Sequence, residues 1–201
     1  MAEGGPWDTR PRVFCIGLNK TGTSSFHAAM EVLGLRSLHG GGPDWGGDKV
    51  NQAVREALAE GRPLLSGIDP VFDAFSDIGQ LSAHFDLLDQ QYPDSRFVLT
   101  VRPIDAWIDS RRRHVERNIA RGEAGEYHGT FLIVDEKRWR REWHNHVEGV
   151  REYFVDRSRF LELDLTAGAG WEPLCKLLQV PEPSVPFPWA NRDRAGASDR
   201  S

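Results

Sequence analysis

The sequence lacks long apolar runs and is poor in cysteine. No window approaches the roughly 20 consecutive apolar residues of a membrane-spanning helix, so we expect no transmembrane segment. Residues 1–11 hold charges and glycines but no apolar stretch, so we expect no secretory signal peptide. The two cysteines, Cys15 and Cys175, fall within predicted apolar elements, which favours buried thiols over a disulfide. Together these absences predict a cytoplasmic protein.

The sequence also has no excess of positive charge and no cluster of metal ligands. Thirty acidic residues against 25 Lys plus Arg give a formal net charge of −5. This balance disfavours nucleic acid or another polyanion as the main partner and favours a small or neutral one. His144 and His146 lie on one predicted helix without the i, i+4 spacing of paired ligands, so we expect no metal site.

The 201 residues are enough for one well-buried domain. We assign residues 1–191 to this domain and expect the polar residues 192–201 to form a flexible tail. Short apolar runs alternate with amphipathic helical patterns, which predicts an α/β fold in three layers, with a mostly parallel five-stranded sheet between helices. The predicted strands are residues 13–16, 35–39, 64–68, 96–101 and 160–163.

The first predicted strand passes through a short polar loop directly into a helical pattern. Gly17 and Gly22 let the backbone turn sharply, and the N–H groups at the start of the helix suit an anion. Lys20 adds a full positive charge. A Walker A motif places its lysine directly after the second glycine, whereas here Thr23 follows Gly22 and the lysine comes two residues earlier. The loop therefore predicts an anion site that differs from that of ATP-binding loops.

A second candidate anion site follows the predicted strand 96–101. Arg102 stands at the carboxyl end of this strand, and Pro103 suits the start of the next helix. The planar guanidinium of Arg102 can bind a phosphate with two hydrogen bonds. Ser110 comes eight residues later on the same predicted helix. The pattern predicts that Arg102 and Ser110 contact one phosphate along the flank of the helix.

Two residues at predicted strand ends are candidates for a general base. His39 ends the strand 35–39, and Asp69 follows the strand 64–68. Ligands of parallel sheets bind at the carboxyl ends of the strands, so either residue can take a proton from a bound hydroxyl. Equally, His39 can be a strand-end histidine bonded to a carbonyl, and Asp69 can cap the segment that begins at Pro70.

The two anion motifs resemble those of sulfotransferases. The segment from Lys20 to Ser24 is similar to their 5′-phosphosulfate loop, which has Lys, a small residue, Gly, Thr and Ser or Thr. Arg102 and Ser110 match their signature for the 3′-phosphate of 3′-phosphoadenosine 5′-phosphosulfate (PAPS). The likeness is greatest to the small, mostly bacterial branch and extends from about Val13 to Asn191. It implies a P-loop-like fold, PAPS as sulfuryl donor, 3′-phosphoadenosine 5′-phosphate as product, and no metal.

The resemblance implies a role for each matched residue. Lys20 neutralises the bridging oxygen as the S–O bond breaks, and Arg102 with Ser110 fixes the 3′-phosphate. Arg192 or Arg194 covers that phosphate, although the Arg-Lys-Gly run of the larger cytosolic enzymes is missing here. The remaining cofactor-binding residues are Thr21, Gly22, Thr23, Ser24 and Ser25.

The base, the adenine platform and the acceptor stay open at this stage. Cytosolic relatives place a His after the third strand, which favours Asp69, and polysaccharide enzymes place a Glu after the second, which favours His39. Ser25 stands where some relatives stack adenine on a Trp. The acceptor is a small molecule, a sugar or a lipid-linked intermediate, and the residue patterns favour no particular oligomeric state. A nucleotide kinase or NTPase, or a non-catalytic nucleotide-binding module, is the alternative.

Overall fold

A five-stranded parallel sheet forms the centre of the protein. The computed structural model describes residues 10–40, 48–155, 157–168 and 170–190, so the predicted tail at 192–201 lies outside the described residues. The sheet has the order β2-β3-β1-β4-β5, and all neighbouring strands pair in parallel. The strands are β1 (Val13–Cys15), β2 (Ser37–His39), β3 (Ala74–Ser76), β4 (Arg96–Val101) and β5 (Phe160–Asp164). The predicted α/β class and the parallel sheet are confirmed.

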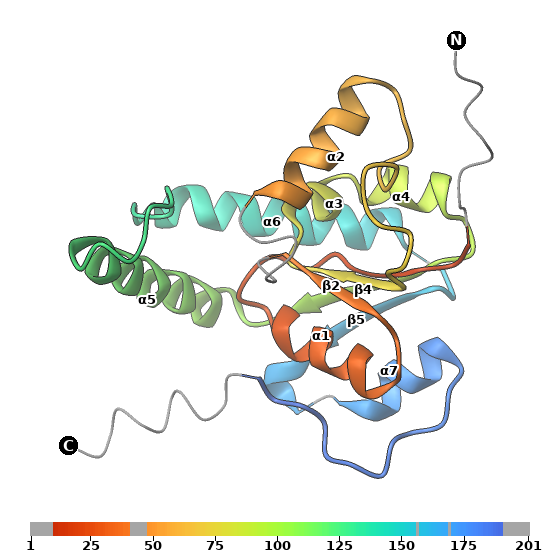
Figure 1. Cartoon of the computed structure of the whole chain (residues 1–201). Coiled ribbons are helices and arrows are strands. Elements are labelled where there is room, and N and C mark those ends of the chain that lie inside the picture. The colour runs from red at the N-terminus through yellow and green to blue at the C-terminus, as the bar shows by residue number, and fades with distance from the viewer. Residues whose placement is uncertain (1–9, 41–47, 156, 169, 191–201) are drawn as a thin grey trace.

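Helices cover both faces of this sheet (Figure 1). Helices α1 and α7 lie on one face, and α2, α3, α4 and α6 lie on the other. The helices are α1 (Thr23–Val32), α2 (Lys49–Ala59), α3 (Gly79–Ala83), α4 (Phe85–Gln91), α5 (Ile104–Glu123), α6 (Glu136–Tyr153) and α7 (Trp171–Leu178), with a short 3-10 turn, η1, at Leu165–Ala167.

Alternation along β1 divides the core between the two helix layers. Phe14 packs into the core on the α2–α4 and α6 side, whereas Cys15 packs with α1 and α7. The Phe14 ring lies 5.4 Å from the rings of both Phe75 and Phe97 on the flanking strands. Cys15 and Cys175 are free and buried, which confirms the prediction of buried thiols. Burial raises the pKa of Cys15 to about 11, so this thiol is not a reactive group at neutral pH.

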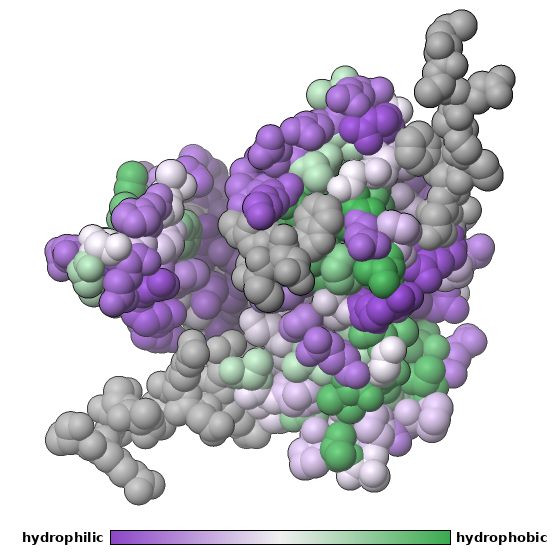
Figure 2. Space-filling model, in the orientation of Figure 1, coloured by the Kyte–Doolittle hydropathy of each residue, from purple (hydrophilic) through white to green (hydrophobic). Residues whose placement is uncertain are grey.

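Helices α5 and α6 form a hairpin with its own small core. Trp107, Ile108, Val115 and Trp139 are buried together in it. In Figure 1 the end of this hairpin extends beyond the sheet on the left. Apolar residues reach the surface at that end (Figure 2), where Ile133 is 75% exposed. None of the helices in the described part of the chain has the length and apolar character needed to span a membrane.

The position of the third strand differs from the prediction. Residues 64–68 form turns instead, in which Ser66 N–H donates to the Pro63 carbonyl and Ile68 N–H to the Leu65 carbonyl. Leu64 and Ile68 are buried, so their apolar character reflects packing of a loop against the core and not strand formation. The strand is the less apolar Ala74–Ser76, and the residue after its carboxyl end is Asp77.

Candidate active site

The loop after β1 approaches β4 closely and turns through left-handed backbone. A Cβ added at Gly17 would overlap the side chain and backbone of Thr100, so only glycine fits there. Gly22, at φ 112°, precedes α1, and a Cβ there would lie 2.8 Å from the Leu165 side chain. Lys20 is also left-handed, at φ 68°. Such strained conformations for residues with side chains concentrate at functional sites, and the loop has the form of an anion cradle.

Two side chains from distant helices hold carbonyl oxygens of this loop. The indole Nε1 of Trp107 on α5 donates to the Asn19 carbonyl at 2.7 Å. Nε2 of His146 on α6 donates to the Ile16 carbonyl at 2.7 Å. Within the loop, the Thr21 hydroxyl donates to the Leu18 carbonyl at 2.6 Å. These bonds direct negative carbonyl ends into the protein, which favours an anion on the opposite side of the loop. Sequence reasoning missed Trp107 and His146, because only folding brings α5 and α6 to the loop.

Arg102 lies at the carboxyl end of β4, as predicted, and contacts the loop. Its Nη1 donates to the Lys20 carbonyl at 3.0 Å. Its Nε is buried and has no hydrogen-bond partner in the described part of the chain. Burial lowers the pKa of Arg102, and the charge of Arg113 lowers it further, while Asp164 acts in the opposite direction. Two like charges beside an unmatched buried donor are the features of a site that takes an anion.

The first residues of α1 contact other parts of the site. The Thr23 hydroxyl is close enough to Asp77 to lower the pKa of that carboxyl, and Ser24 Oγ lies 3.4 Å from His39 Nε2. Ser25 is buried, and its Oγ accepts a hydrogen bond from the Ala190 N–H at 3.1 Å. Thr23 and Ser24 therefore face the sheet edge, whereas Ser25 fixes the segment that follows α7.

His39 and Asp77 meet at the carboxyl ends of β2 and β3. His39 Nδ1 lies 2.9 Å from Ser76 Oγ, and His39 Nε2 lies 3.8 Å from Asp77 Oδ2. The ring of His27 on α1 stacks on His39 at a centroid distance of 5.2 Å. Asp77 has φ 55°, so two of the three described non-glycine residues with positive φ, Lys20 and Asp77, lie at this edge.

Burial lowers the pKa of His39 and raises the pKa of Asp77, because it disfavours the charged form of each. It lowers the pKa of His39 to about 4, with smaller contributions from the charges of His27 and Lys20. It raises the pKa of Asp77, and Lys20 and the Thr23 hydroxyl offset only part of that rise. At neutral pH His39 is therefore an uncharged imidazole, and Asp77 is a more basic carboxylate than an exposed aspartate.

Asp69 does not lie at this edge. It is exposed in the loop before β3, where its Oδ1 accepts a hydrogen bond from the Val71 N–H at 2.9 Å. The neighbouring Pro70 carbonyl accepts from Arg10, which precedes β1 at the amino-terminal edge of the sheet. The cap that the sequence offered as the alternative for Asp69 is what the structure contains. The geometric basis for Asp69 as a base disappears with the misplaced strand, and Asp77 is the carboxylate at a strand end.

Two further predicted residues are Ser110 and Arg192. Ser110 is partly buried on α5, and no polar contact of its side chain is present among the described residues. Arg192 lies outside the described residues. In the described ranges, no three His, Cys, Asp or Glu side chains come together as a metal site.

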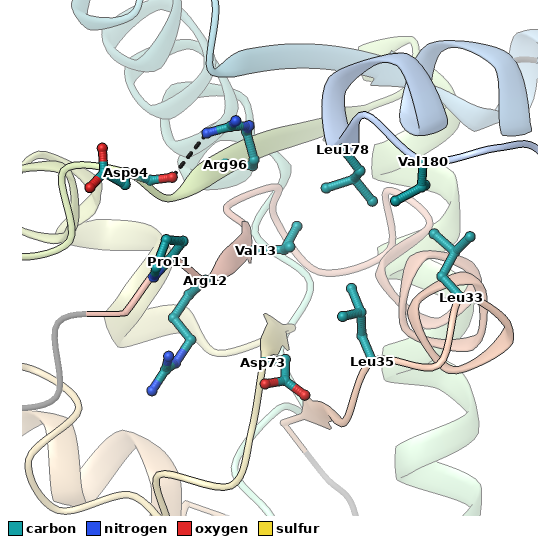
Figure 3. A pocket seen from close by; sticks show the side chains of 10 residues that line it. All are labelled: Pro11, Arg12, Val13, Leu33, Leu35, Asp73, Asp94, Arg96, Leu178 and Val180. Atoms are coloured by element: carbon teal, nitrogen blue, oxygen red, sulfur yellow. Dashed lines mark hydrogen bonds between the residues drawn. The ribbon is translucent and has the colours of Figure 1, made fainter.

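Two cavities lie at opposite ends of the strands. One of about 350 Å³ adjoins residues 17–19 of the loop and is also lined by Asp77, Arg111, Glu142 and His146. A cavity of about 430 Å³ lies at the amino-terminal edge (Figure 3). Its lining consists of Pro11, Arg12, Val13, Leu33, Leu35, Asp73, Asp94, Arg96, Leu178 and Val180. None of these ten belongs to the predicted site, so the smaller cavity is the one adjacent to the candidate chemistry.

The fold is that of an α/β protein, and the strand-to-helix loop after β1 has a shape that suits an anionic group. A family model described as a sulfotransferase domain matches residues 12–124 and 121–195. These matches span most of the chain, so the protein belongs to the sulfotransferase-domain family, a family of transferases. A relative named Ava biosynthesis cluster protein M, from Aspergillus versicolor, is 23% identical over 209 residues, covering 88% of this chain and 79% of the relative.

Proposed function

We propose that this protein transfers a sulfuryl group from PAPS to the hydroxyl of a small-molecule, sugar or lipid-linked acceptor. The observation that carries the proposal is a second cationic site beside the phosphate loop. Arg102 contacts the loop at Lys20, yet its buried Nε has no hydrogen-bond partner among the described residues, and a second arginine, Arg113, lies close by. A nucleotide with phosphates at both the 5′ and the 3′ position suits two cationic sites, the loop and Arg102, whereas a nucleotide with a single phosphate needs only the loop.

The residues of the site fit PAPS. Glycine at positions 17 and 22 leaves the space that a Cβ would take, and the first N–H groups of α1 have no helical partner. These groups suit the 5′-phosphosulfate. Arg102 and Arg113 suit the 3′-phosphate, because an anion there removes the repulsion between them. Ser110 is proposed to bind the same phosphate, and Arg192 to cover it.

PAPS supplies a sulfuryl group whose S–O bond to the 5′-phosphate breaks as the acceptor oxygen bonds to sulfur. Lys20 provides positive charge beside the oxygen at which negative charge develops. Thr21 to Ser25 contribute N–H groups to the cradle. Thr23 and Ser24 add hydroxyls, of which Thr23 lies near Asp77 and Ser24 lies 3.4 Å from His39 Nε2. The protein's own cations do the work that Mg²⁺ does in phosphoryl transfer.

We propose Asp77 as the group that accepts the proton of the acceptor hydroxyl. It lines the cavity beside the loop, and its raised pKa makes it a better base than an exposed aspartate. His39 lies 3.8 Å from Asp77 Oδ2, and we propose that it positions this carboxylate as a neutral imidazole. His39 remains the alternative base.

Calorimetry tests directly whether Arg102 forms a second phosphate site. We expect 3′-phosphoadenosine 5′-phosphate to bind without metal and at least about tenfold more tightly than AMP, which lacks the 3′-phosphate. Arg102→Met should remove that preference, and Arg141→Met, an exposed arginine on α6, should leave it unchanged. Tighter binding of ATP with Mg²⁺ would instead support a kinase or NTPase. Binding of the product nucleotide without turnover of labelled PAPS over a broad acceptor panel would support a non-catalytic module.

A further inference from the structure

The cavity beside the phosphate loop contains a buried arginine from outside the predicted site. Arg111 on α5 lines this cavity together with Asp77, Glu142 and His146. Its side chain is 6% exposed. Its guanidinium carbon lies 4.6, 5.1 and 4.9 Å from the ring centroids of Trp107, Phe131 and Trp139. Three aromatic rings therefore surround the charge and keep it in a fixed place.

The hydrogen bonding of Arg111 is incomplete. Within the described residues its one hydrogen bond runs from Nη1 to Glu142 Oε2 at 3.1 Å. Its Nε is buried and has no acceptor in the part of the chain that the structure describes. Aromatic faces attract the cation but offer no lone pairs in the guanidinium plane. Leaving a charged donor buried and unmatched is costly, so an acceptor is missing from this plane. Because Arg111 lines the cavity, a molecule bound in the cavity can supply this acceptor.

One cation, Arg111, and two carboxylates, Glu142 and Asp77, line the cavity, and further cations lie near it. Several cations lie near this face of α5. Burial lowers the pKa of His114 to about 4, and the charges of Lys20, Arg117 and Arg111 contribute to that shift. Two carboxylates oppose them. Glu142 is already neutralised by Arg111, and its side chain is 37% exposed, so it can turn towards water. Asp77 has a raised pKa and directly follows the carboxyl end of β3.

We propose that Arg111 determines acceptor specificity by binding a carboxylate of the acceptor, whose hydroxyl then faces Asp77. This inference rests on the proposed sulfuryl transfer and adds the substrate class: hydroxylated organic acids small enough for a cavity of about 350 Å³. A carboxylate matches the planar guanidinium through two parallel hydrogen bonds. Arg111 holds one end of the acceptor, and Asp77 takes the proton at the other.

A matched pair of probes separates charge from shape. We would titrate 4-hydroxyphenylacetate and the nearly isosteric 4-hydroxyphenylacetamide into protein with and without bound 3′-phosphoadenosine 5′-phosphate. The acid should bind at least about tenfold more tightly than the amide. Arg111→Met should reduce this ratio to about one, and the exposed Arg141→Met should not change it. Equal binding of the two probes by the unmodified protein, or a preference that survives Arg111→Met, would overturn the proposal.

Glu142→Gln provides a second variant that keeps the arginine. It removes the competing carboxylate, so the affinity for the acid should rise several-fold while the affinity for the amide stays the same. If Arg111→Met does not fold, an unchanged acid affinity in Glu142→Gln would overturn the inference. Titration of 3′-phosphoadenosine 5′-phosphate alone tests the proposed donor separately from the proposed acceptor class. Loss of acid preference with normal nucleotide binding contradicts only the acceptor class, whereas failure to bind the nucleotide contradicts the proposed donor.

Discussion

The two ends of β3 each carry an aspartate, and the two carboxylates have opposite properties. At the amino end, Asp73 Oδ2 accepts from the backbone N–H and Nε of Arg36 at 3.1 and 3.3 Å, and Oδ1 lies 3.3 Å from Arg10. Burial alone would raise the pKa of Asp73, but these bonds and charges outweigh it and lower the pKa. At the carboxyl end, burial raises the pKa of Asp77 despite the nearby Lys20.

This difference separates a structural carboxylate from a chemical one. Asp73 is matched by two arginines, so its charged form is stabilised and its oxygens are occupied. Asp77 has a left-handed backbone conformation and lines a cavity. It lies beside His39, which burial keeps neutral. The same residue type at the two ends of one short strand thus fixes the amino edge through ion pairs and, under the proposed function, offers a basic group at the carboxyl edge. Each substitution below tests one side of this contrast.

The largest expected effect is on turnover in Asp77→Asn. Loss of the general base should lower kcat by about 10³ while binding of 3′-phosphoadenosine 5′-phosphate changes little. Asp69→Asn and Asp73→Asn are matched controls and should keep kcat within about threefold. Steady-state kinetics with labelled PAPS would measure this. Near-normal turnover in Asp77→Asn, together with a large loss in His39→Asn, would make His39 the base.

Lys20→Ala should come next, with a fall in kcat of a few hundred-fold. Lys20 is the cation of the loop, and removing one group that stabilises developing charge typically has an effect of about 10²–10³. The exposed Lys49→Ala on α2 controls for general loss of positive charge. If Lys20→Ala turned over PAPS at a near-normal rate, the proposed role at the leaving oxygen would be wrong.

The stability of the fold should fall as the pH drops from about 6.5 towards 4. Burial lowers the pKa of His39 from 6.5 to about 4, so folding favours its neutral form and this contribution is lost when the unfolded chain takes up a proton. The shift corresponds to about 3 kcal/mol at pH 4 and below. Asp77 acts in the opposite direction, because a raised carboxyl pKa favours the folded state at low pH.

Urea denaturation at several pH values would isolate the histidine. The free energy of unfolding of His39→Asn should depend less steeply on pH between 6.5 and 4 than that of the unmodified protein. His114, whose pKa is also about 4, is present in both proteins and cancels in the difference. Parallel curves for the two proteins would show that His39 is not held neutral by the fold.

The smallest effect should come from Asp73→Asn. Loss of the contacts to Arg36 and Arg10 should lower the free energy of unfolding at pH 7 by about 1 kcal/mol. Because the pKa of Asp73 is lowered, its contribution is present above the ordinary carboxyl pKa of 3.8 and disappears below it. Equal stability of the variant and the unmodified protein at pH 7 would mean that these ion pairs contribute nothing measurable.

Residue patterns alone predicted the α/β class, the parallel sheet, the buried thiols and the resemblance to sulfotransferases, which the fold and the family match confirm. These features depend on local signals: apolar periodicity, and glycines with a lysine at fixed spacing between a strand and a helix. The same local signals misplaced one strand, because the buried turn at residues 64–68 is more apolar than β3.

Which groups meet at the site depends on how the chain folds. Asp77, and not Asp69, follows the carboxyl end of β3, and Trp107, Arg111 and His146 reach the loop region from α5 and α6. No spacing in the sequence encodes these contacts, because they depend on how helices pack against the end of a sheet. The pKa shifts of His39 and Asp77 have the same origin, since burial is a property of the folded chain and not of residue order.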